Sequence, residues 1–151
     1  MDATELQQIY LTALRDIEEF TAEIDDDGGI LLTSEEYGVM FFILDAESDP
    51  EFMMLIYPSF ADMELLGLTR EQLLRAINNV NGTSKAVKLY IPPEYMDEKC
   101  DVNAGIECFL AGSNAPPNVD LLRAILVRNI SAIFDSVRNL VSEAEKLKRN
   151  G

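Results

Sequence analysis

Residues 68–91 read LTREQLLRAINNVNGTSKAVKLYI, and this stretch predicts a helix that is followed at once by a strand. The helix is expected to begin at Thr69, because Thr69 and Gln72 can satisfy each other's backbone amides in a capping box. Leu68 can pack against Leu73 across the first turn as a hydrophobic staple. The apolar residues that recur on one side of the helix are Leu73, Leu74, Ile77 and Val80.

The end of this helix and the strand after it are also predicted from local pattern. Asn81-Gly82 is a pair that readily adopts positive φ, so the helix is expected to end there. Residues 85–91 then alternate between two sets, which predicts a strand with one face in the core. The set expected to face the core is Val87, Leu89 and Ile91, and the opposite set is Ala86, Lys88 and Tyr90.

The rest of the chain predicts one further helix before this stretch, four further strands and a long final helix. The first helix is expected to run from residue 2 to about residue 24 and to end at the turn Asp25-Asp26-Asp27-Gly28-Gly29. Its apolar residues recur every third or fourth position, namely Leu6, Ile9, Ala13, Ile17, Phe20 and Ile24. Strands are expected near residues 30–34, 37–44, 52–57 and 102–111, and the final helix near residues 119–148. The order αβββαββα predicts an α+β fold, a five-stranded antiparallel sheet with helices packed on it, in a single domain over residues 1–151.

The helix-to-strand passage resembles the YbjN family, in which an amphipathic helix ends in an Ile-Asn-x-x-Asn signature and leads into a strand. The matching residues are Ile77, Asn78 and Asn81, and the resemblance extends over about residues 24–140. It implies a fold like that of type III secretion chaperones and a role as a bacterial sensory transduction regulator, with no known reaction. Asparagines near a helix end commonly bond to loose carbonyls or to the next turn. A structural role is therefore expected for Asn78 and Asn81, with ligand contact as the alternative.

Acidic residues are concentrated in the first part of the chain, which has a net charge of −15 as a whole. Residues 1–69 contain 17 acidic residues and a single basic one, Arg15, whereas residues 70–151 contain 11 basic and 10 acidic residues. A field of this sign repels phosphates, so neither nucleic acid nor an anionic membrane is an expected partner. The acidic part is either a solvated surface or a docking face for a basic partner.

The residues do not form a catalytic, cofactor-binding or metal-binding pattern. The chain has no histidine, which removes Ser-His and Cys-His nucleophile pairs and the commonest transition-metal ligand. Gly28-Gly29 does not belong to a glycine-rich phosphate loop. The stretch from residue 25 to residue 36 fails as an EF-hand, because Gly29 replaces a central oxygen ligand and Ile30 stands where the loop needs glycine. We therefore expect a protein that is not an enzyme and uses no cofactor or metal.

The predicted location is the cytoplasm. The longest apolar run, residues 39–44, is far shorter than the about 20 residues that span a bilayer, and it predicts a core strand. The N-terminus lacks the pattern of an export signal, since Arg15 is the first basic residue. The two cysteines are then expected as thiols, with Cys108 in the core and Cys100 exposed in a polar loop.

The final helix has a wider apolar face than packing against one sheet requires. Its main stripe consists of Leu122, Leu126, Ile130, Ile133, Val137 and Leu140. Along one flank Val127, Phe134 and Val141 recur at intervals of seven, which makes them a candidate dimer or partner surface. A symmetric homodimer is expected, and a client helix or another part of the same chain is the alternative cover.

A second candidate surface lies around Pro92-Pro93, where Tyr90 and Tyr95 could form the floor of a peptide groove. The alternative for both tyrosines is a place at the edge of the core. These features together predict a non-enzymatic protein-binding module, a sensory transduction regulator or chaperone-like protein that binds another polypeptide. The alternative function is a structural or stress-related homodimer without a client.

Overall fold

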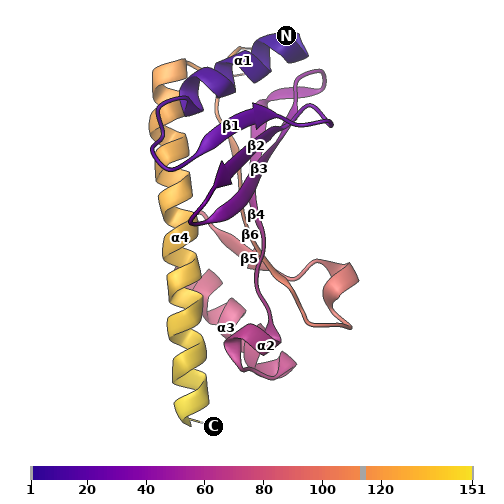
Figure 1. The fold of residues 1–151 in the computed structure, drawn as a ribbon, viewed down its shortest axis with the longest axis vertical. Helices are drawn as coiled ribbons and strands as arrows, with labels where there is room; N and C mark the ends of the chain where they lie inside the picture. Colours follow the sequence, from indigo (N-terminus) through magenta and orange to yellow (C-terminus); the bar gives the residue numbers. More distant parts are fainter. Residues whose placement is uncertain (1, 113–114, 151) are drawn as a thin grey trace. The chain divides into compact units, whose positions relative to one another are not determined.

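The computed structural model describes residues 2–112 and 115–150 and confirms the α+β class, with helices and an antiparallel sheet. The elements in chain order are α1 (Ala3–Leu14), β1 (Thr21–Ile24), β2 (Ile30–Ser34), β3 (Gly38–Asp45), β4 (Asp49–Ala61), α2 (Met63–Leu66), α3 (Arg70–Thr83), β5 (Lys88–Tyr90), the 3-10 helix η1 (Pro93–Tyr95), β6 (Val102–Phe109) and α4 (Val119–Asn150) (Figure 1). The strand order in the sheet is β1-β2-β3-β4-β6-β5. Within the described residues, no helix combines the length and the apolar character needed to cross a membrane.

The prediction of five strands is wrong, because residues 21–24 form a sixth strand instead of the end of the first helix. Helix α1 stops at Leu14, and Glu19 has a φ of 76°, which lies outside the right-handed helical region. Strand β1 then pairs with β2 in antiparallel register from Thr21 opposite Thr33 to Ile24 opposite Ile30. The acidic turn that predicts a helix end is a hairpin turn, in which Asp25 Oδ1 accepts bonds from the amides of residues 27 and 29.

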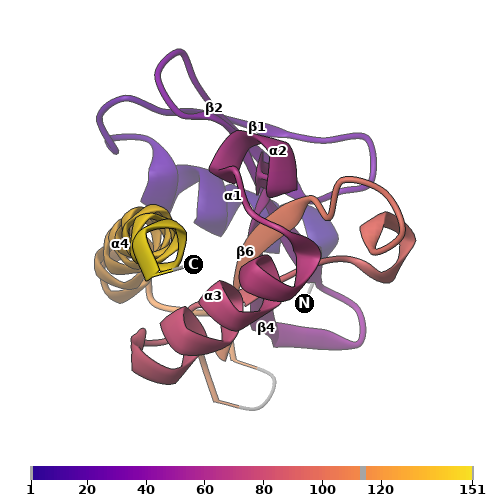
Figure 2. The same cartoon turned by 90° about the horizontal axis from the view of Figure 1, so that it is seen from below.

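Helix α3 begins where the capping pattern predicts. Thr69 Oγ1 accepts from the amide of Gln72 at 3.2 Å, and Gln72 Oε1 accepts from the amide of Thr69 at 2.9 Å. Met63–Leu66, a single turn that the sequence pattern does not predict, forms α2 just before it, so the predicted element order is also wrong. Seen from below, α3 lies beside the last part of α4 (Figure 2).

The predicted end of α3 is wrong by about two residues. Asn81 and Gly82 remain helical, and the positive φ of 63° falls on Ala86 instead. Strand β5 is accordingly reduced to three residues. Leu74 also departs from the prediction, because it is 42% exposed while Ala76 is buried. The buried residues of α3 begin at Leu73 and are spaced at i, i+3, i+4 and i+7. Leu74 directly follows Leu73 and therefore points away from the buried face of the helix.

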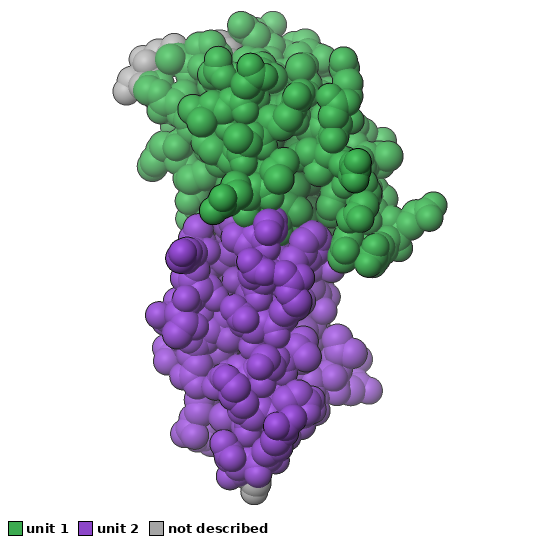
Figure 3. Space-filling view, turned by 90° about the vertical axis from the view of Figure 1, so that its left-hand side faces the viewer, with its two compact units in different colours: residues 1–56, 107–130 green, residues 57–106, 131–151 purple. Residues whose placement is uncertain are grey.

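The chain divides into two compact units, unit 1 with residues 1–56 and 107–130 and unit 2 with residues 57–106 and 131–151 (Figure 3). In unit 1, α1 packs on one side of the sheet, which we call the inner face. Its buried residues include Leu32, Met40, Phe42, Met53 and Leu55.

Contacts from α1 and α4 hold this inner face. The ring of Tyr10 in α1 lies 5.8 Å from that of Phe42, measured between centroids. Arg123 of α4 donates to the carbonyls of Ala13 at 3.0 Å and Thr12 at 2.9 Å, near the end of α1. These carbonyls have no partner inside the helix, so a cationic donor at this end is favourable for both hydrogen bonding and the helix dipole.

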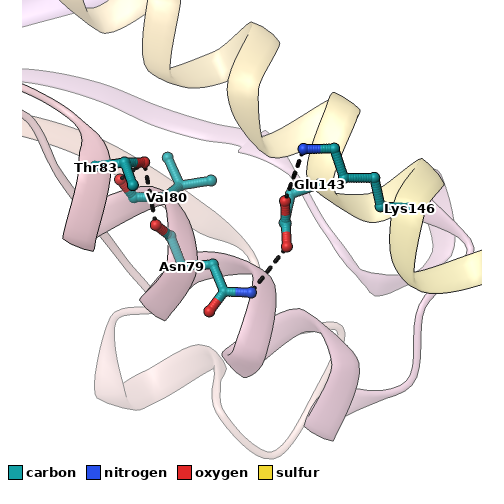
Figure 4. Close-up of polar contacts among 5 residues, drawn as sticks. All are labelled: Asn79, Val80, Thr83, Glu143 and Lys146. Carbon is teal, nitrogen blue, oxygen red and sulfur yellow. Dashed lines mark hydrogen bonds and ion pairs between the residues drawn. The ribbon is translucent and has the colours of Figure 1, made fainter. Parts of the chain in front are cut away.

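In unit 2, α3 contacts α4 through a polar cluster at its surface (Figure 4). Asn79 Nδ2 donates to Glu143 Oε1 at 2.8 Å, and Lys146 Nζ lies 3.5 Å from the other oxygen of the same carboxylate. Thr83 Oγ1 bonds back to the carbonyl of Asn79 at 3.2 Å. The two helices also bury apolar residues, including Ile77 of α3 and Leu140 of α4.

The capping box of α3 makes a first testable prediction. Thr69→Ala is expected to lower the free energy of unfolding by about 1 kcal/mol, because the amide of Gln72 loses its side-chain acceptor. Urea denaturation with an unchanged slope measures the effect. Thr12→Ala is the matched control, since its hydroxyl bonds only back to the carbonyl of Gln8 inside a helix. An unchanged midpoint for Thr69→Ala would show that the box contributes nothing.

Candidate functional site

Strand β3 contains the longest apolar run of the chain, yet only one of its faces is buried. Met40 and Phe42 are 0% exposed, whereas Val39 is 40% and Ile43 46% exposed. The prediction of a core strand therefore holds for alternate residues and is wrong for those between them. Because side chains alternate along a strand, the exposed residues lie together on the side of the sheet opposite the inner face.

This second side of unit 1 is apolar over several neighbouring strands. The antiparallel register places Ile43 opposite Met54 and Phe41 opposite Ile56, which is only 6% exposed and so marks the covered end of this side. Phe109 at the end of β6 is 71% exposed and meets Phe52 of β4 edge-on, with 5.7 Å between ring centroids. We call this surface the open face. Its residues are Val39, Phe41, Ile43, Phe52, Met54 and Phe109.

Charged groups of both signs lie on the side of the sheet that includes the open face, since Lys88 of β5 stands opposite Gly105 of β6 and so on the same side. Glu23 is exposed on β1 and stands opposite Leu31, which itself stands opposite Phe41. Glu107 is exposed on β6, two residues before Phe109 and hence on the same side of the strand.

Unit 1 as a whole carries a strongly negative net charge. Unit 1 contains 17 acidic and three basic residues, which makes its net charge −14, whereas unit 2 contains 10 acidic and nine basic residues. One of the three basic residues, Arg123, already binds the carbonyls of α1 and lies 3.8 Å from Asp16. The open face is thus an apolar surface in a strongly negative unit.

The candidate partner surface on the final helix is divided between the two units. Val127 lies in unit 1 and is 46% exposed. Phe134 and Val141 lie in unit 2, where Phe134 is half-buried and meets Tyr57 edge-on with 5.9 Å between ring centroids. Val141 is 47% exposed and lines a groove of about 310 Å³ together with Leu65, Phe60 and other residues of unit 2. Phe134 therefore already has an aromatic contact within its own chain.

The two tyrosines of the candidate peptide groove occupy different elements of unit 2. Tyr90 is half-buried on β5, and the ammonium of Lys88 lies 5.5 Å from the centroid of its ring. Tyr95 is half-buried at the end of η1, and its carbonyl accepts from the amide of Cys100 at 3.1 Å. Neither tyrosine lines the groove at Val141. A peptide groove at Tyr90 and Tyr95 stays a prediction.

The three residues of the Ile-Asn-x-x-Asn signature have different surroundings. Ile77 is buried and Asn78 is exposed. The side chain of Asn81 makes a pair of hydrogen bonds with the backbone of Leu89, donating to its carbonyl at 2.9 Å and accepting from its amide at 2.8 Å. Asn81 thus pairs with strand β5 from within a helix, which explains why the helix does not end at this residue.

One of the two cysteines, Cys100, has surroundings that differ from the prediction. The prediction that Cys100 is exposed is wrong, since it is 0% exposed and its thiol donates to the carbonyl of Met96 at 3.4 Å. Cys108 is half-buried in unit 1, and burial raises the pKa of its thiol, while the polar side chain of Asn129 acts in the opposite direction. Both cysteines are free thiols.

Carboxylate and thiol side chains are the commonest metal ligands left to a chain without histidine. Among residues 2–112 and 115–150, no group of three or more carboxylate or thiol side chains is arranged to hold a metal ion. Asp25, which stands at the first position of the EF-hand comparison, uses its side chain for the hairpin turn.

Sequence reasoning does not identify the open face, although part of its signal is present. The apolar run of residues 39–44 shows that both sides of β3 are apolar. Which side is left uncovered depends on where α1 packs, and Phe109 becomes part of the surface only because β6 lies next to β4.

Comparison of the chain with models of protein families, with curated proteins and with solved structures found no match.

Proposed function

We propose that this protein is a non-enzymatic binding module that holds another polypeptide on the open face of unit 1. The observation that carries the proposal is the exposure of Ile43 and Phe109 on one continuous apolar sheet surface. Exposed apolar patches of this kind commonly mark interaction sites, and aromatic residues often dominate their binding energy. Membership of the YbjN family, a fold like that of type III secretion chaperones, a cytoplasmic location and a role as a sensory transduction regulator or chaperone-like protein belong to the same proposal.

The shape and charge of the open face favour a polypeptide over other partners. A sheet surface is broad, whereas sites for small molecules are usually concave. The net charge of −14 on unit 1 opposes phosphate backbones and anionic lipids. The absence of histidine from the chain and the apolar character of the face favour binding rather than catalysis.

The alternative function is a structural or stress-related homodimer through Val127, Phe134 and Val141. The exposure of Val127 and Val141 favours it, but the contact of Phe134 with Tyr57 means that the central residue of the three has an apolar neighbour without a second chain. We therefore place the open face before the final helix as the partner surface.

Selection from a random peptide library tests the proposal without knowledge of the natural partner. Peptides enriched on the wild-type protein are expected to lose at least about tenfold in affinity for Ile43→Ser/Phe109→Ser, because the two exposed anchors of the face are removed. The matched control is Leu65→Ser/Val141→Ser, which changes two exposed residues of the unit 2 groove and is expected to leave the affinity unchanged. Circular dichroism and the unfolding midpoint establish that both variants are folded.

Two outcomes contradict the proposal. If the control variant loses binding and the open-face variant keeps it, the partner surface is the unit 2 groove lined by Leu65 and Val141. If no peptide is enriched and light scattering at high micromolar concentration shows a dimer that Phe134→Glu converts into a folded monomer, the homodimer alternative replaces the binding module.

A further inference from the structure

Strand β1 lies at one edge of the sheet, and part of its backbone has no partner among the described residues. In the turn that follows it, the amide of Asp25 donates to the carbonyl of Gly29 at 3.1 Å. Hydrogen-bonded pairs alternate with non-bonded pairs along an antiparallel ladder, so Glu23 exchanges hydrogen bonds with β2 whereas Ala22 and Ile24 do not. The amides and carbonyls of Ala22 and Ile24 therefore point toward the free edge, where a further strand can bind them.

A groove of about 370 Å³ lies beside this edge, between α1 and β1. Its apolar walls include Leu11 of α1 and Phe20, which precedes β1. Ile24 belongs to the inner-face side of the sheet, because it stands opposite the buried Ile30. It is nevertheless 41% exposed, since the strand on which it lies is the last one on this side. Apolar side chains of a further strand would continue the inner face and fill the groove.

The other side of β1 specifies a charge for such a strand. Glu23 is exposed there and makes no ion pair with the described residues. The neighbouring strands β2 and β3 contain no lysine or arginine. Opposite charges that face each other across two strands are stabilising, and like charges there are destabilising. A symmetric pairing that used Ala22 and Ile24 of two copies would place Glu23 opposite Glu23, so a second copy is a poor occupant.

We propose that the edge of β1 binds an extended segment of a partner protein as an added antiparallel strand. Its apolar residues lie opposite Ala22 and Ile24, and a lysine or arginine lies opposite Glu23. Hydrogen bonds to the free edge supply affinity, and the alternating side chains supply specificity. Arg15, which also lines the groove, disfavours a basic residue at the two apolar positions. This site is separate from the open face and does not depend on the function proposed above.

Peptides with a central Val-Lys-Val flanked by two threonines at each end serve as probes, with glutamine or glutamate in place of lysine as variants. Affinity is obtained by titrating isotope-labelled protein and following the amide resonances of Ala22 and Ile24. We expect the lysine peptide to bind about threefold to tenfold more tightly than the glutamine peptide at low salt, with a smaller ratio at high salt. The glutamate peptide should bind most weakly.

Methylation of single peptide nitrogens tests the strand geometry without any change to the protein. In the proposed register the valine amides face β1 and the lysine amide faces away from it. Methylation of a valine nitrogen is therefore expected to weaken binding at least about tenfold, and methylation of the lysine nitrogen by less than about threefold.

Two substitutions in β1 test the same contact from the protein. Ile24→Pro removes an amide that faces the free edge and leaves the ladder to β2 intact, so binding is expected to be lost while circular dichroism shows a folded protein. Ile24→Val is its control and should bind as the wild type does. Glu23→Gln is expected to make the lysine and glutamine peptides equal in affinity, whereas Glu47→Gln, at another exposed carboxylate of unit 1, should keep the preference for lysine.

The contrary results are distinct from those for the open face. Equal effects of methylation at valine and at lysine would show that the peptide does not add as a strand, and the inference falls. If Ile43→Ser/Phe109→Ser abolishes binding and Ile24→Pro leaves it unchanged, the peptide binds to the open face, so the inference falls and the proposed function stands. If Ile24→Pro instead converts a wild-type dimer into a folded monomer, a second copy occupies the edge and the inference falls.

Discussion

Phe42→Ala is expected to lower the free energy of unfolding by about 3–5 kcal/mol, the largest effect among the substitutions considered for this protein. The side chain of Phe42 is 0% exposed, and its ring contacts that of Tyr10 at a centroid distance of 5.8 Å. Alanine would leave a cavity between α1 and the inner face, with the loss of both transfer free energy and packing. Urea denaturation followed by circular dichroism measures the change at constant slope.

The next residue in the same strand provides the control. Ile43 is 46% exposed on the open face, so Ile43→Ala is expected to cost less than about 1 kcal/mol. The two substitutions differ by one position in an apolar run, and only the side of the sheet distinguishes them. Equal losses of stability would mean that Ile43 is buried, and the open face would then not exist.

Asn81→Ala is expected to lower the free energy of unfolding by about 2–3 kcal/mol. The substitution removes both hydrogen bonds that the side-chain amide makes with the carbonyl and the amide of Leu89. Leu89 is 2% exposed, so its backbone groups would have little water to replace the lost partners. Chemical denaturation gives the total effect, and faster hydrogen exchange at the Leu89 amide is expected to show that it originates there.

Two further variants define the role of Asn81. Asn78→Ala changes the other asparagine of the signature, which is exposed, and is expected to shift stability by no more than about 0.5 kcal/mol. Asn81→Asp keeps an acceptor for the Leu89 amide but removes the donor to its carbonyl, so its effect should be at least that of one lost hydrogen bond. Equal effects of Asn78→Ala and Asn81→Ala would show that the contact with Leu89 is not what stabilises this passage.

The start and the end of α3 illustrate what local sequence can predict. The capping box at Thr69 forms because its donors and acceptors lie within three residues of one another. The end of the helix is different, because Asn81 is held by Leu89, eight residues further along the chain. Asn81-Gly82 is a residue pair that commonly ends a helix. The local pattern that predicts this end does not include the contact of Asn81 with Leu89.

The first helix shows the same limit over a longer distance. Ile17, Phe20 and Ile24 continue the helical spacing beyond Leu14, so the local pattern favours a longer helix. Strand β1 forms because residues 21–24 pair with β2, a pairing that also gives the acidic turn its role in a hairpin. Cys100 follows the same rule, since it lies in a polar stretch of sequence and is nevertheless fully buried.

The sequence by itself determined the features that depend on neighbouring residues: the α+β class, the start of α3, the approximate extent of β2, the long final helix with most of its apolar stripe buried and the acidic character of the first part of the chain. The tertiary structure alone decided which side of each strand is covered. In β3 both sides are apolar, so the pattern contains no information on which one α1 occupies. The open face, and with it the candidate site, arises from that choice, because burial depends on contacts between residues that are distant in the chain.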